Sequence, residues 1–344
     1  GFEGKVGQLA IAVARGRNGN RGCWGGAWAR PAKKVWFQTV RRMHSKYKGI
    51  GVRVLCELFG KTRHAYYDRI WSETEWERTK VAVLAIVAVV RRRQPKLGTR
   101  RLYHKIEGSL ANNDLKVGRD TLHEILLDAG MTIKVKRRIG PRTTDSNHGF
   151  PLYPNLVKGV VPTGPNQQWV SDITYLSLTD CFCFLSLVTD AYSHMIVGYN
   201  LSLLMTAEQT IVALEMALAT LPEGDIDLIH HSDRGSQYAC YAHTGILIAR
   251  GIRISMTEDS DPRDNGIAER VNGILKDEQG LEMKFGSFEE AWEKVQEAIE
   301  IYNYERPHGS IDYLSPAEAH KMSGPIPKRW KYWHQRKGRQ DVPA

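Results

Sequence analysis

The stretch of sequence from residue 168 to residue 201 reads QWVSDITYLSLTDCFCFLSLVTDAYSHMIVGYNL. It holds three β-rich runs, at 168–178, 181–190 and 194–201, separated by short turns. Runs of this length and composition predict a three-stranded meander. The first run carries one acidic residue, Asp172, in an otherwise apolar strand pattern. This meander sets the fold of the C-terminal half of the chain.

The segments that follow the meander alternate between helical and strand patterns. Helical patterns cover 206–221, 241–250, 264–279 and 288–304, and short strand patterns cover 226–231 and 253–256. Three strands, helix, strand, helix, strand and final helices is the order of a ribonuclease-H-like α/β fold. The expected core is therefore a mixed five-stranded sheet flanked by helices.

The N-terminal half has helical patterns and no strand patterns. Val52, Leu55 and Phe59 are spaced along one face of a short helix, Gly60 ends it, and Thr62 is suited to cap the next one. Helix, short glycine-containing turn and helix is the helix-turn-helix pattern, which predicts an all-α DNA-binding region.

Further helical patterns continue this region. One long helix is expected over 73–93, and its apolar segment 81–90 suits either a core or a helix-pairing surface. A second helix pair follows at 99–107 and 118–129. Short helix pairs are often only packing units, but the basic charge of this half favours DNA.

Shifts in composition divide the chain into segments. Residues 1–42 are rich in glycine and tryptophan and lack periodicity, so they are expected to be a disordered leader or a non-native upstream reading. The predicted segments are the leader 1–42, a helix-turn-helix with a long helix 43–94, a second helix-turn-helix-like DNA-binding region 95–142, a linker 143–165, the catalytic core 166–322 and a basic tail 323–344.

Charge is distributed unevenly along the 344 residues. Residues 1–150 hold 31 Lys and Arg against 12 Asp and Glu, a net +19, whereas residues 151–320 hold 10 against 25, a net −15. The last 24 residues add +6, which gives +10 in total. A basic half indicates a polyanionic partner, most readily nucleic acid, and an acidic block suits either solvated surface or a divalent-metal site.

Composition also excludes several classes of protein. Five cysteines at irregular positions do not suit a disulfide scaffold. The longest apolar run, 81–90, is about half of what a membrane helix needs. No signal-peptide pattern is visible. The sequence therefore predicts a soluble protein of a reducing compartment.

Three acidic residues lie in conspicuous positions of the C-terminal half. Asp172 falls within the first strand, Asp233 just past the fourth strand, and Glu269 on a helix with apolar neighbours. An acidic side chain among apolar residues is costly unless it is paired or bound to a cation. Any one of them alone suits a turn or a cap, but three converging carboxylates would bind a hard divalent metal such as Mg²⁺.

The spacing of these residues is specific. Thirty-five residues separate Asp233 from Glu269, and Lys276 lies two helical turns beyond Glu269. With the motifs HSDRGSQY at 231–238 and YNYERPH at 302–308, the chain resembles insertion-sequence transposases of the DDE superfamily, encoded by the second of two overlapping reading frames and related to retroviral integrases.

The resemblance implies a polynucleotidyl transferase. Asp172, Asp233 and Glu269 match its catalytic, metal-binding acids, and Lys276 matches a residue that contacts DNA near the cut. Two Mg²⁺ ions, with Mn²⁺ as a substitute, would serve DNA 3′-end cleavage and strand transfer. The implied partners are transposon-end and target DNA, further copies of the chain, and a protein from the upstream reading frame. The implied location is the bacterial cytoplasm, without a membrane.

Other residues are predicted to support the site or to contact DNA. His231, Asp264 and Asn265 lie next to the acids in sequence and are expected to surround them. The predicted DNA contacts are basic residues of the helical half: Arg63, His64, Arg69, Arg100, Arg101, Arg119, Lys136, Arg137 and Arg138.

Two alternatives remain open from sequence. A ribonuclease-H-like nuclease would cut without joining strands. A transposon-end DNA-binding protein would bind without any chemistry.

Overall fold

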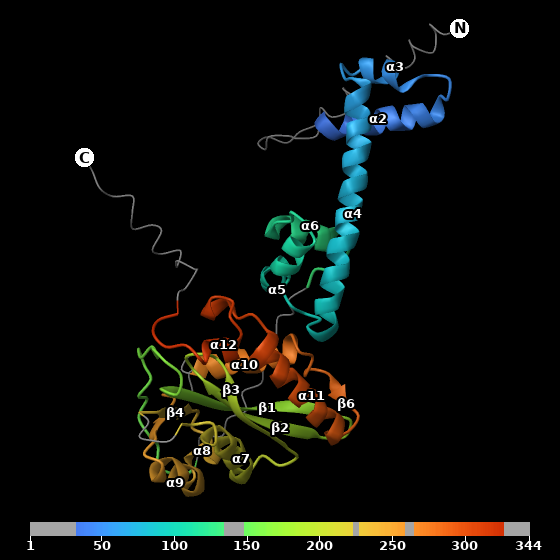
Figure 1. Cartoon of the computed structure of the whole chain (residues 1–344). Coiled ribbons are helices and arrows are strands. Elements are labelled where there is room, and N and C mark those ends of the chain that lie inside the picture. The colour runs from blue at the N-terminus through green and yellow to red at the C-terminus, as the bar shows by residue number, and fades with distance from the viewer. Residues whose placement is uncertain (1–31, 134–147, 223–226, 259–264, 327–344) are drawn as a thin grey trace, which may run out of the picture. The chain divides into compact units, whose positions relative to one another are not determined.

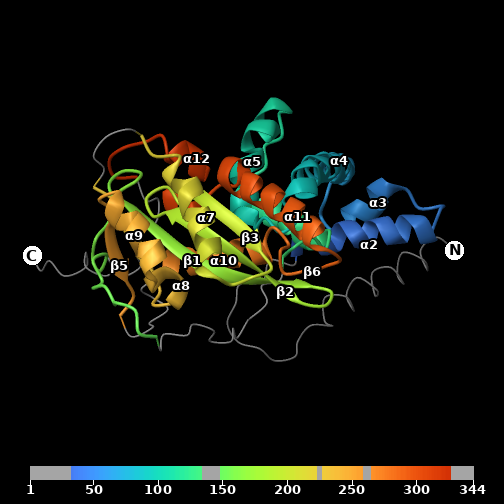
Figure 2. The ribbon, with the colours of Figure 1, turned by 90° about the horizontal axis from the view of Figure 1, so that it is seen from below.

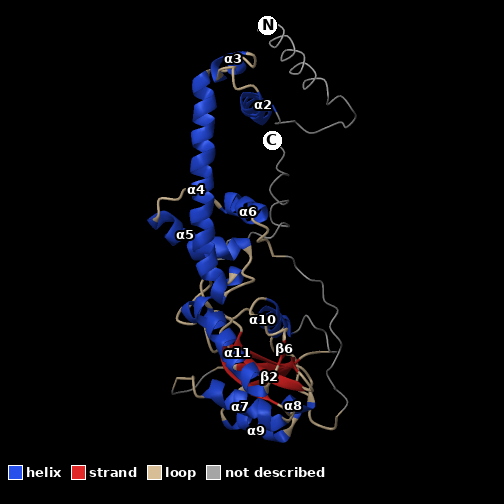
Figure 3. Ribbon diagram, turned by 90° about the vertical axis from the view of Figure 1, so that its right-hand side faces the viewer, coloured by secondary structure: helices blue, strands red, loops and turns tan. Residues whose placement is uncertain are grey.

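The structure is a computed structural model that describes residues 32–133, 148–222, 227–258 and 265–326. The chain divides into two compact units, residues 1–82 and 83–344, which are described separately. Among the described residues, strands are confined to the C-terminal part, and the N-terminal part is helical (Figure 3). Within the described segments, no helix is both long and apolar enough to cross a membrane.

The first unit is built from helix α2 (Ala32–Lys46), helix α3 (Val52–Glu57) and the start of helix α4 (Arg63–Arg93). Phe37 and Val40 of α2 are 2% and 0% exposed and pack in one cluster with Leu55 of α3 and Tyr66 of α4. The leader predicted over 1–42 is therefore wrong for residues 32–42. Its apolar residues, three apart on one helix face, are covered by α3 and α4.

The first predicted helix-turn-helix corresponds to α3 and α4. Gly60 takes a left-handed φ of 62° between them, and the Thr62 hydroxyl accepts a hydrogen bond from the Ala65 amide at 3.2 Å, as predicted for a cap. The structure differs in one respect. The two helices expected on either side of residue 72 form one helix of 31 residues, because no glycine or proline interrupts it.

The second unit begins with the end of α4 and a helix pair. Helix α5 (Thr99–Asn112) and helix α6 (Arg119–Asp128) bury Leu102, Ile106 and Leu122 between them, close to the predicted pair. The described part of the predicted linker, residues 148–165, has neither helix nor strand.

The sheet of the second unit is mixed, as expected. Its strands are β1 (Gln168–Leu178), β2 (Phe182–Asp190), β3 (Ile196–Ser202), β4 (Ile229–Ser232), β5 (Arg253–Met256) and β6 (Lys284–Phe285). The order is β3-β2-β1-β4-β5, in which the meander is antiparallel and β4 and β5 run parallel to β1. This is the ribonuclease-H-like order. The two-residue strand β6 was not predicted, since so short a run carries no period.

Strand β1 is paired differently along its two edges. On one edge β2 pairs with residues 169–177. On the other edge β4 pairs with 168–170 and β6 with 177–178. Within the described chain, no strand pairs with residues 171–176 on that second edge. The side-chain amide of Asn265 instead donates to the carbonyl oxygen of Ser171 at 3.0 Å.

Helices cover both faces of the sheet (Figures 1 and 2). Helix α7 (Ala207–Leu218), the short α8 (Ser236–Ala239) and α9 (Tyr241–Ala249) lie on one face over Trp169 and Val188. Helix α10 (Gly266–Asp277) and helix α11 (Phe288–Glu300) lie on the other over Leu176 and Leu185. The chain then forms the π-helix η2 (Ile301–Glu305), the 3-10 turn η3 (Gly309–Ile311) and α12 (Pro316–Ala319).

Candidate active site

Asp172 lies near the middle of β1, on the stretch paired only with β2. Its Oδ2 atom accepts a hydrogen bond from the side-chain amide of Asn272 on α10 at 2.6 Å. Asn272 is buried and lies one helical turn beyond Glu269, so α10 presents an acid and an amide in succession toward β1. Asn272 was not predicted as a site residue, although its three-residue spacing from Glu269 was a usable signal.

Asp233 follows the last residue of β4. Its Oδ1 accepts a hydrogen bond from the backbone amide of Gly235 at 3.0 Å, in the turn that leads into α8. A Cβ added to Gly235 would lie 3.0 Å from that same Oδ1, so a glycine suits this turn. Asp233 is half-buried, which leaves its carboxylate partly accessible.

The three predicted acids act electrostatically on one another. Burial, followed by the charge of Asp233 and, more weakly, that of Glu269, raises the pKa of Asp172 to about 7. Hydrogen bonds from the Ile173 amide and from Asn272 oppose that rise. The fold therefore brings Asp233 and Glu269 near enough to Asp172 to act on its charge.

Glu269 differs from the two aspartates in being exposed. It projects from α10, whose apolar residues Ala268, Val271 and Leu275 are buried, as the sequence predicted. In the described residues, no group of three His, Cys, Asp or Glu side chains is arranged to hold one metal ion. The arrangement is thus a coupled pair, Asp172 and Asp233, with Glu269 near it.

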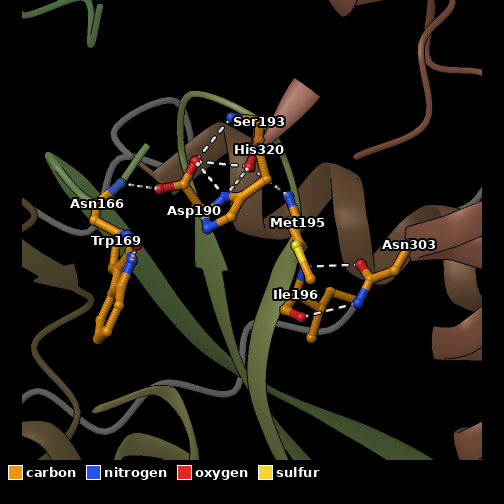
Figure 4. A network of polar contacts seen from close by, with 8 residues as sticks. All are labelled: Asn166, Trp169, Asp190, Ser193, Met195, Ile196, Asn303 and His320. Atoms are coloured by element: carbon orange, nitrogen blue, oxygen red, sulfur yellow. Dashed lines mark hydrogen bonds and ion pairs between the residues drawn. The ribbon is translucent and has the colours of Figure 1, made fainter. Parts of the chain in front are cut away.

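Asp190 of β2 shows what a structural acid looks like in the same sheet (Figure 4). It is fully buried, and its carboxylate accepts from the Asn166 amide at 2.7 Å and from the Ser193 amide and hydroxyl at 2.8 and 2.7 Å. The imidazole of His320 lies 3.8 Å from it. Every face of this carboxylate is used internally, unlike that of Asp172.

The residues around Asp172 are of the kind that bind a hard divalent cation, although three of them are not gathered around one point in the described structure. Carboxylate oxygens with few internal donors are the ligands that Mg²⁺ prefers. The Oδ1 atom of Asn272, which is buried, has no hydrogen-bond partner among the described residues, so this amide also has an oxygen to offer. Asp172, Asp233 and Glu269 supply the charge that such an ion needs.

The predicted surrounding residues occupy several positions. His231 is buried in β4, next to Val170 in register, and its Nδ1 lies 2.9 Å from the Ser255 hydroxyl of β5. Asn265 reaches the Ser171 carbonyl from the start of α10. Asp264 lies outside the described residues.

Two buried side chains near the acids were not singled out by sequence. Tyr238 is 3% exposed, and its hydroxyl has no hydrogen-bond partner among the described residues. Burial, followed by the charges of Asp172 and Asp233, raises its pKa well above the usual value. His243 packs edge-on against the Tyr238 ring at 5.4 Å.

The predicted DNA contacts fall into different environments. Arg63 and His64 are exposed at the start of α4, whereas Arg69 is half-buried, with Nε 3.6 Å from a Glu73 carboxylate oxygen. Arg100 is exposed on α5, Lys276 is half-buried on α10, and Arg119 pairs with Asp120 at 2.8 Å. Lys136, Arg137 and Arg138 lie outside the described residues.

Arg101 has an internal partner instead of an open face. Its Nη1 donates to Oε1 of Glu278 at 2.7 Å, and the same carboxylate accepts from Nε and Nη2 of Arg306 at 2.8 and 3.1 Å. Arg306, from the YNYERPH motif, is fully buried. Sequence could not reveal this triad, because Arg101 and Glu278 are 177 positions apart.

Comparison with known proteins agrees with this fold. Two family models described as integrase core domain match residues 162–262 and 250–316. The fold and the matched residues thus define a protein with an integrase core domain. More particularly, the chain belongs to the family of insertion-sequence DDE transposases.

Two relatives and one solved structure illustrate the similarity. The chain is 38% identical over 272 residues to the insertion element IS600 uncharacterized 31 kDa protein of Shigella sonnei, covering 76% of this chain and 96% of that one. It is 28% identical to transposase InsF for insertion sequence IS3A of Escherichia coli K12, covering 78% and 93%. The chain also aligns with the solved structure of the HTLV-2 integrase catalytic core domain in complex with magnesium. The alignment covers 46% of this chain and 97% of the integrase domain, at 17% identity and a TM-score of 0.37. The family assignment rests on the sequence matches.

Proposed function

We propose that this transposase cleaves the 3′ ends of its own insertion sequence and joins them to target DNA in a divalent-metal-dependent reaction. The observation that carries the proposal is the coupling of Asp172 to Asp233 and Glu269, on a buried strand that gives Asp172 few internal hydrogen bonds. Its similarity to a transposase of an insertion sequence supports the same activity.

Asp172, Asp233 and Glu269 would hold the metal through carboxylate oxygens. When bound, divalent metal would stabilise the charge that develops on the oxygens of the phosphoryl group during its transfer. Asn272 orients the Asp172 carboxylate through its 2.6 Å hydrogen bond. Lys276, two turns beyond Glu269, would contact a DNA phosphate, and a water or a 3′-hydroxyl would attack without a covalent link to the protein.

DNA, further copies of the chain and a protein from the upstream reading frame are the partners this proposal implies. The exposed Arg63 and His64 on α4 and Arg100 on α5 are the DNA contacts it favours. Holding two element ends together requires at least two active sites, so we expect self-association on DNA.

The test uses purified full-length protein, DNA carrying the element ends, target DNA and Mg²⁺. Asp172→Asn, Asp233→Asn and Glu269→Gln should each lower cleavage and joining at least about a hundredfold while end binding persists. Asp180→Asn changes an exposed acid of the β1–β2 turn and should leave both reactions unchanged.

The outcomes separate the rival functions. Cleaved ends without joined products would identify a nuclease. End binding with neither product, in any metal, would identify a DNA-binding protein without chemistry. Wild-type joining by the Glu269→Gln variant would show that the site is assigned wrongly.

A further inference from the structure

The motif YNYERPH at residues 302–308 has no task in the proposed function. In the structure it forms the π-helix η2 and the turn that follows, at the end of α11. The end of α4 and helix α5 contact this motif and the loop beyond it, up to residue 313. The motif is therefore the place where the helices of the second unit meet its catalytic core.

Helix α5 has an apolar face and a polar face. Its buried residues Leu102 and Ile106 pack with α6, whereas Arg101 and Lys105, four residues apart on one helix face, reach residues 278 and 305 of the core. Among the described residues, the two apolar clusters on the faces of the sheet contain no residue of α5 or α6. The contacts that hold this helix pair on the core are thus mainly polar.

Two of these polar contacts meet at Glu305. The Nη1 atom of Arg93 lies 2.7 Å from Oε1 of Glu305, and the Nζ atom of Lys105 donates to the backbone carbonyl oxygen of Glu305 at 2.7 Å. Both basic residues are exposed, so a polyanion in solution can reach them. Exposed ion pairs contribute little individually and weaken as salt concentration rises, so these contacts are easily exchanged.

One aromatic contact accompanies them. The imidazole of His104 stacks on the ring of Tyr313, with centroids 3.8 Å apart and planes inclined by 28°. Asp312 and Tyr313 both have a left-handed φ, of 57° and 64°. Residues other than glycine rarely adopt this conformation, and strained segments of this kind cluster at binding sites and switch regions. The backbone is therefore strained where the loop meets α5.

A cavity of about 1010 Å³ lies between the helix pair and the core. Residues of α5 and α6 line it from one side, and residues of α10 and the segment 306–313 line it from the other. Protein interiors contain few voids larger than a water molecule. A boundary with so much open space and mainly polar contacts resembles one between domains that move relative to each other.

The triad on Glu278 differs from the contacts at Glu305. Its side chains are 0% exposed for Arg306, 17% for Glu278 and 23% for Arg101, whereas the Arg93 side chain is 50% exposed. A polyanion therefore reaches the contacts at Glu305 first, and the triad is suited to stay closed as a pivot.

We propose that Glu305 latches the helices to the core in the DNA-free protein, and that DNA opens this latch by competing for Arg93 and Lys105. The latch consists of the two contacts at Glu305 and the His104–Tyr313 stack. The inference rests on the proposed function, because DNA is the competing polyanion. While the latch is closed, Arg93 and Lys105 are withheld from phosphates, and the apparent affinity for DNA falls with the fraction of open molecules.

The first experiment measures the affinity of purified full-length protein for DNA carrying the element ends, without Mg²⁺. Glu305→Gln should tighten binding about two- to fivefold, the range that an exposed ion pair contributes. Glu300→Gln removes an equal charge from the exposed end of α11 and is the matched control, which should tighten binding less. In an Arg93→Gln background, Glu305→Gln should act no more strongly than Glu300→Gln, because the pair is already broken.

A second measurement reports closure directly. His104→Cys with Tyr313→Cys places two thiols where the rings stack, and a short bismaleimide should join them in the DNA-free protein, as peptide mass spectrometry would show. Adding element-end DNA or heparin before the reagent should lower the yield of this cross-link. Each single-cysteine variant, which cannot form the link, is the control.

The cross-linked protein should also bind DNA differently. The logarithm of the binding constant falls with the logarithm of salt concentration by about 0.9 per phosphate contact, a quantity called here the salt slope. With Arg93 and Lys105 withheld, the cross-linked protein should have a salt slope lower by about 1.8 than the same variant before cross-linking.

Several results would overturn the proposal. These are equal effects of Glu305→Gln and Glu300→Gln, a cross-link yield that neither DNA nor heparin lowers, and an unchanged salt slope after cross-linking. The cross-link is made with Glu305 intact, so it decides the matter even if Glu305→Gln unfolds.

Failure of the latch is distinguishable from failure of the proposed function. A protein that joins strands while its cross-link yield ignores DNA would lose only the latch. A protein whose cross-link yield falls with DNA, but which never joins strands, would keep the latch and lose the proposed chemistry.

Discussion

The fully buried guanidinium of Arg306 donates from Nε to Oε2 of Glu278 over 2.8 Å. Glu278 caps the C-terminal end of α10, and Arg306 follows the π-helix η2. Because Arg101 of α5 shares the same carboxylate, one acid ties the second helix pair to the helix that carries Glu269.

Removing this acid should destabilise the second unit. Glu278→Gln would leave Arg306 buried without a counter-charge, which typically costs about 3–5 kcal/mol. We expect thermal or denaturant unfolding to show this loss, with Glu293→Gln on the exposed face of α11 as a control that stays near wild type. A Glu278→Gln variant as stable as the control would show that the triad contributes nothing.

The same acid makes stability depend on pH. Burial alone would raise the pKa of Glu278, but the hydrogen bonds and charges of Arg306 and Arg101 outweigh it and lower the pKa. A pKa that is lower in the folded state stabilises the protein at pH values above the pKa of the unfolded state. This stabilisation is lost as the pH falls through the pKa of the folded state. The difference in the free energy of unfolding between the wild type and Glu278→Gln should therefore narrow below about pH 4.5.

Asp172 should have the opposite pH dependence in protein without metal. Its folded-state pKa of about 7 lies above the ordinary value of 3.8, so its ionisation opposes folding increasingly from pH 4 to 7. At pH 8 in EDTA, Asp172→Asn should be more stable than wild type by at least about 1 kcal/mol. At pH 4 the wild type and Asp172→Asn should be equally stable. At pH 8, Mg²⁺ should reduce the difference in their free energies of unfolding, because it binds the wild type.

Asp190→Asn is the matched control for that experiment. Its carboxylate accepts three hydrogen bonds of 2.8 Å or less, so the amide would lose acceptors and should destabilise by about 1–3 kcal/mol at pH 8. If Asp172→Asn behaved like Asp190→Asn, Asp172 would be a structural residue.

Asn272 should affect metal use more than DNA binding. Asn272→Ala removes the 2.6 Å hydrogen bond that orients Asp172, and loss of such a contact typically costs 10–100-fold in metal affinity or activity. The Mg²⁺ concentration for half-maximal joining should rise by that factor, with unchanged end-DNA affinity. Asn113→Ala, on the exposed end of α5, should leave the Mg²⁺ titration at wild type.

Arg63 and Arg101 should separate DNA contact from internal packing. Arg63→Gln should lower the salt slope of DNA binding by about 0.9 and leave the melting temperature unchanged, because the side chain is exposed. Arg101→Gln should lower the melting temperature, because it weakens the pairing of Glu278. If Arg101→Gln lowered the salt slope and Arg63→Gln lowered only the melting temperature, Arg101 would be a DNA contact and Arg63 would not.

Local periodicity predicted most of the core. β1 and β5 have the predicted bounds, and Asp172, Asp233 and Glu269 were singled out from their positions in strand and helix patterns, their spacing and the resemblance to a known family. These features are local, so a single stretch of sequence carries them. The helix α2 was missed because the irregular, glycine-rich pattern of residues 1–26 was extended to residue 42, over the buried Phe37 and Val40.

Contacts between distant positions could not be predicted. The pairing of Arg101 with Glu278 depends on how α5 docks on α10, which no local pattern encodes. The two-residue strand β6 exists only because β1 offers it an edge. Because its partner Glu278 is distant in the sequence, Arg101 could not be told apart from its basic neighbours and was predicted to contact DNA.

The uneven pairing of β1 has a mechanical consequence. Over residues 171–176 the central strand forms one hydrogen-bond ladder, with β2. In the described structure, β4 and β6 pair with its other edge only near its two ends. Displacing the backbone there disturbs half as many sheet hydrogen bonds as in a strand paired on both edges. Asp172 therefore stands on a span of the central strand that a single ladder holds, while strands pair with both edges at residues 169–170 and 177. A shift of the backbone at Asp172 would break fewer sheet hydrogen bonds than the same shift at those residues.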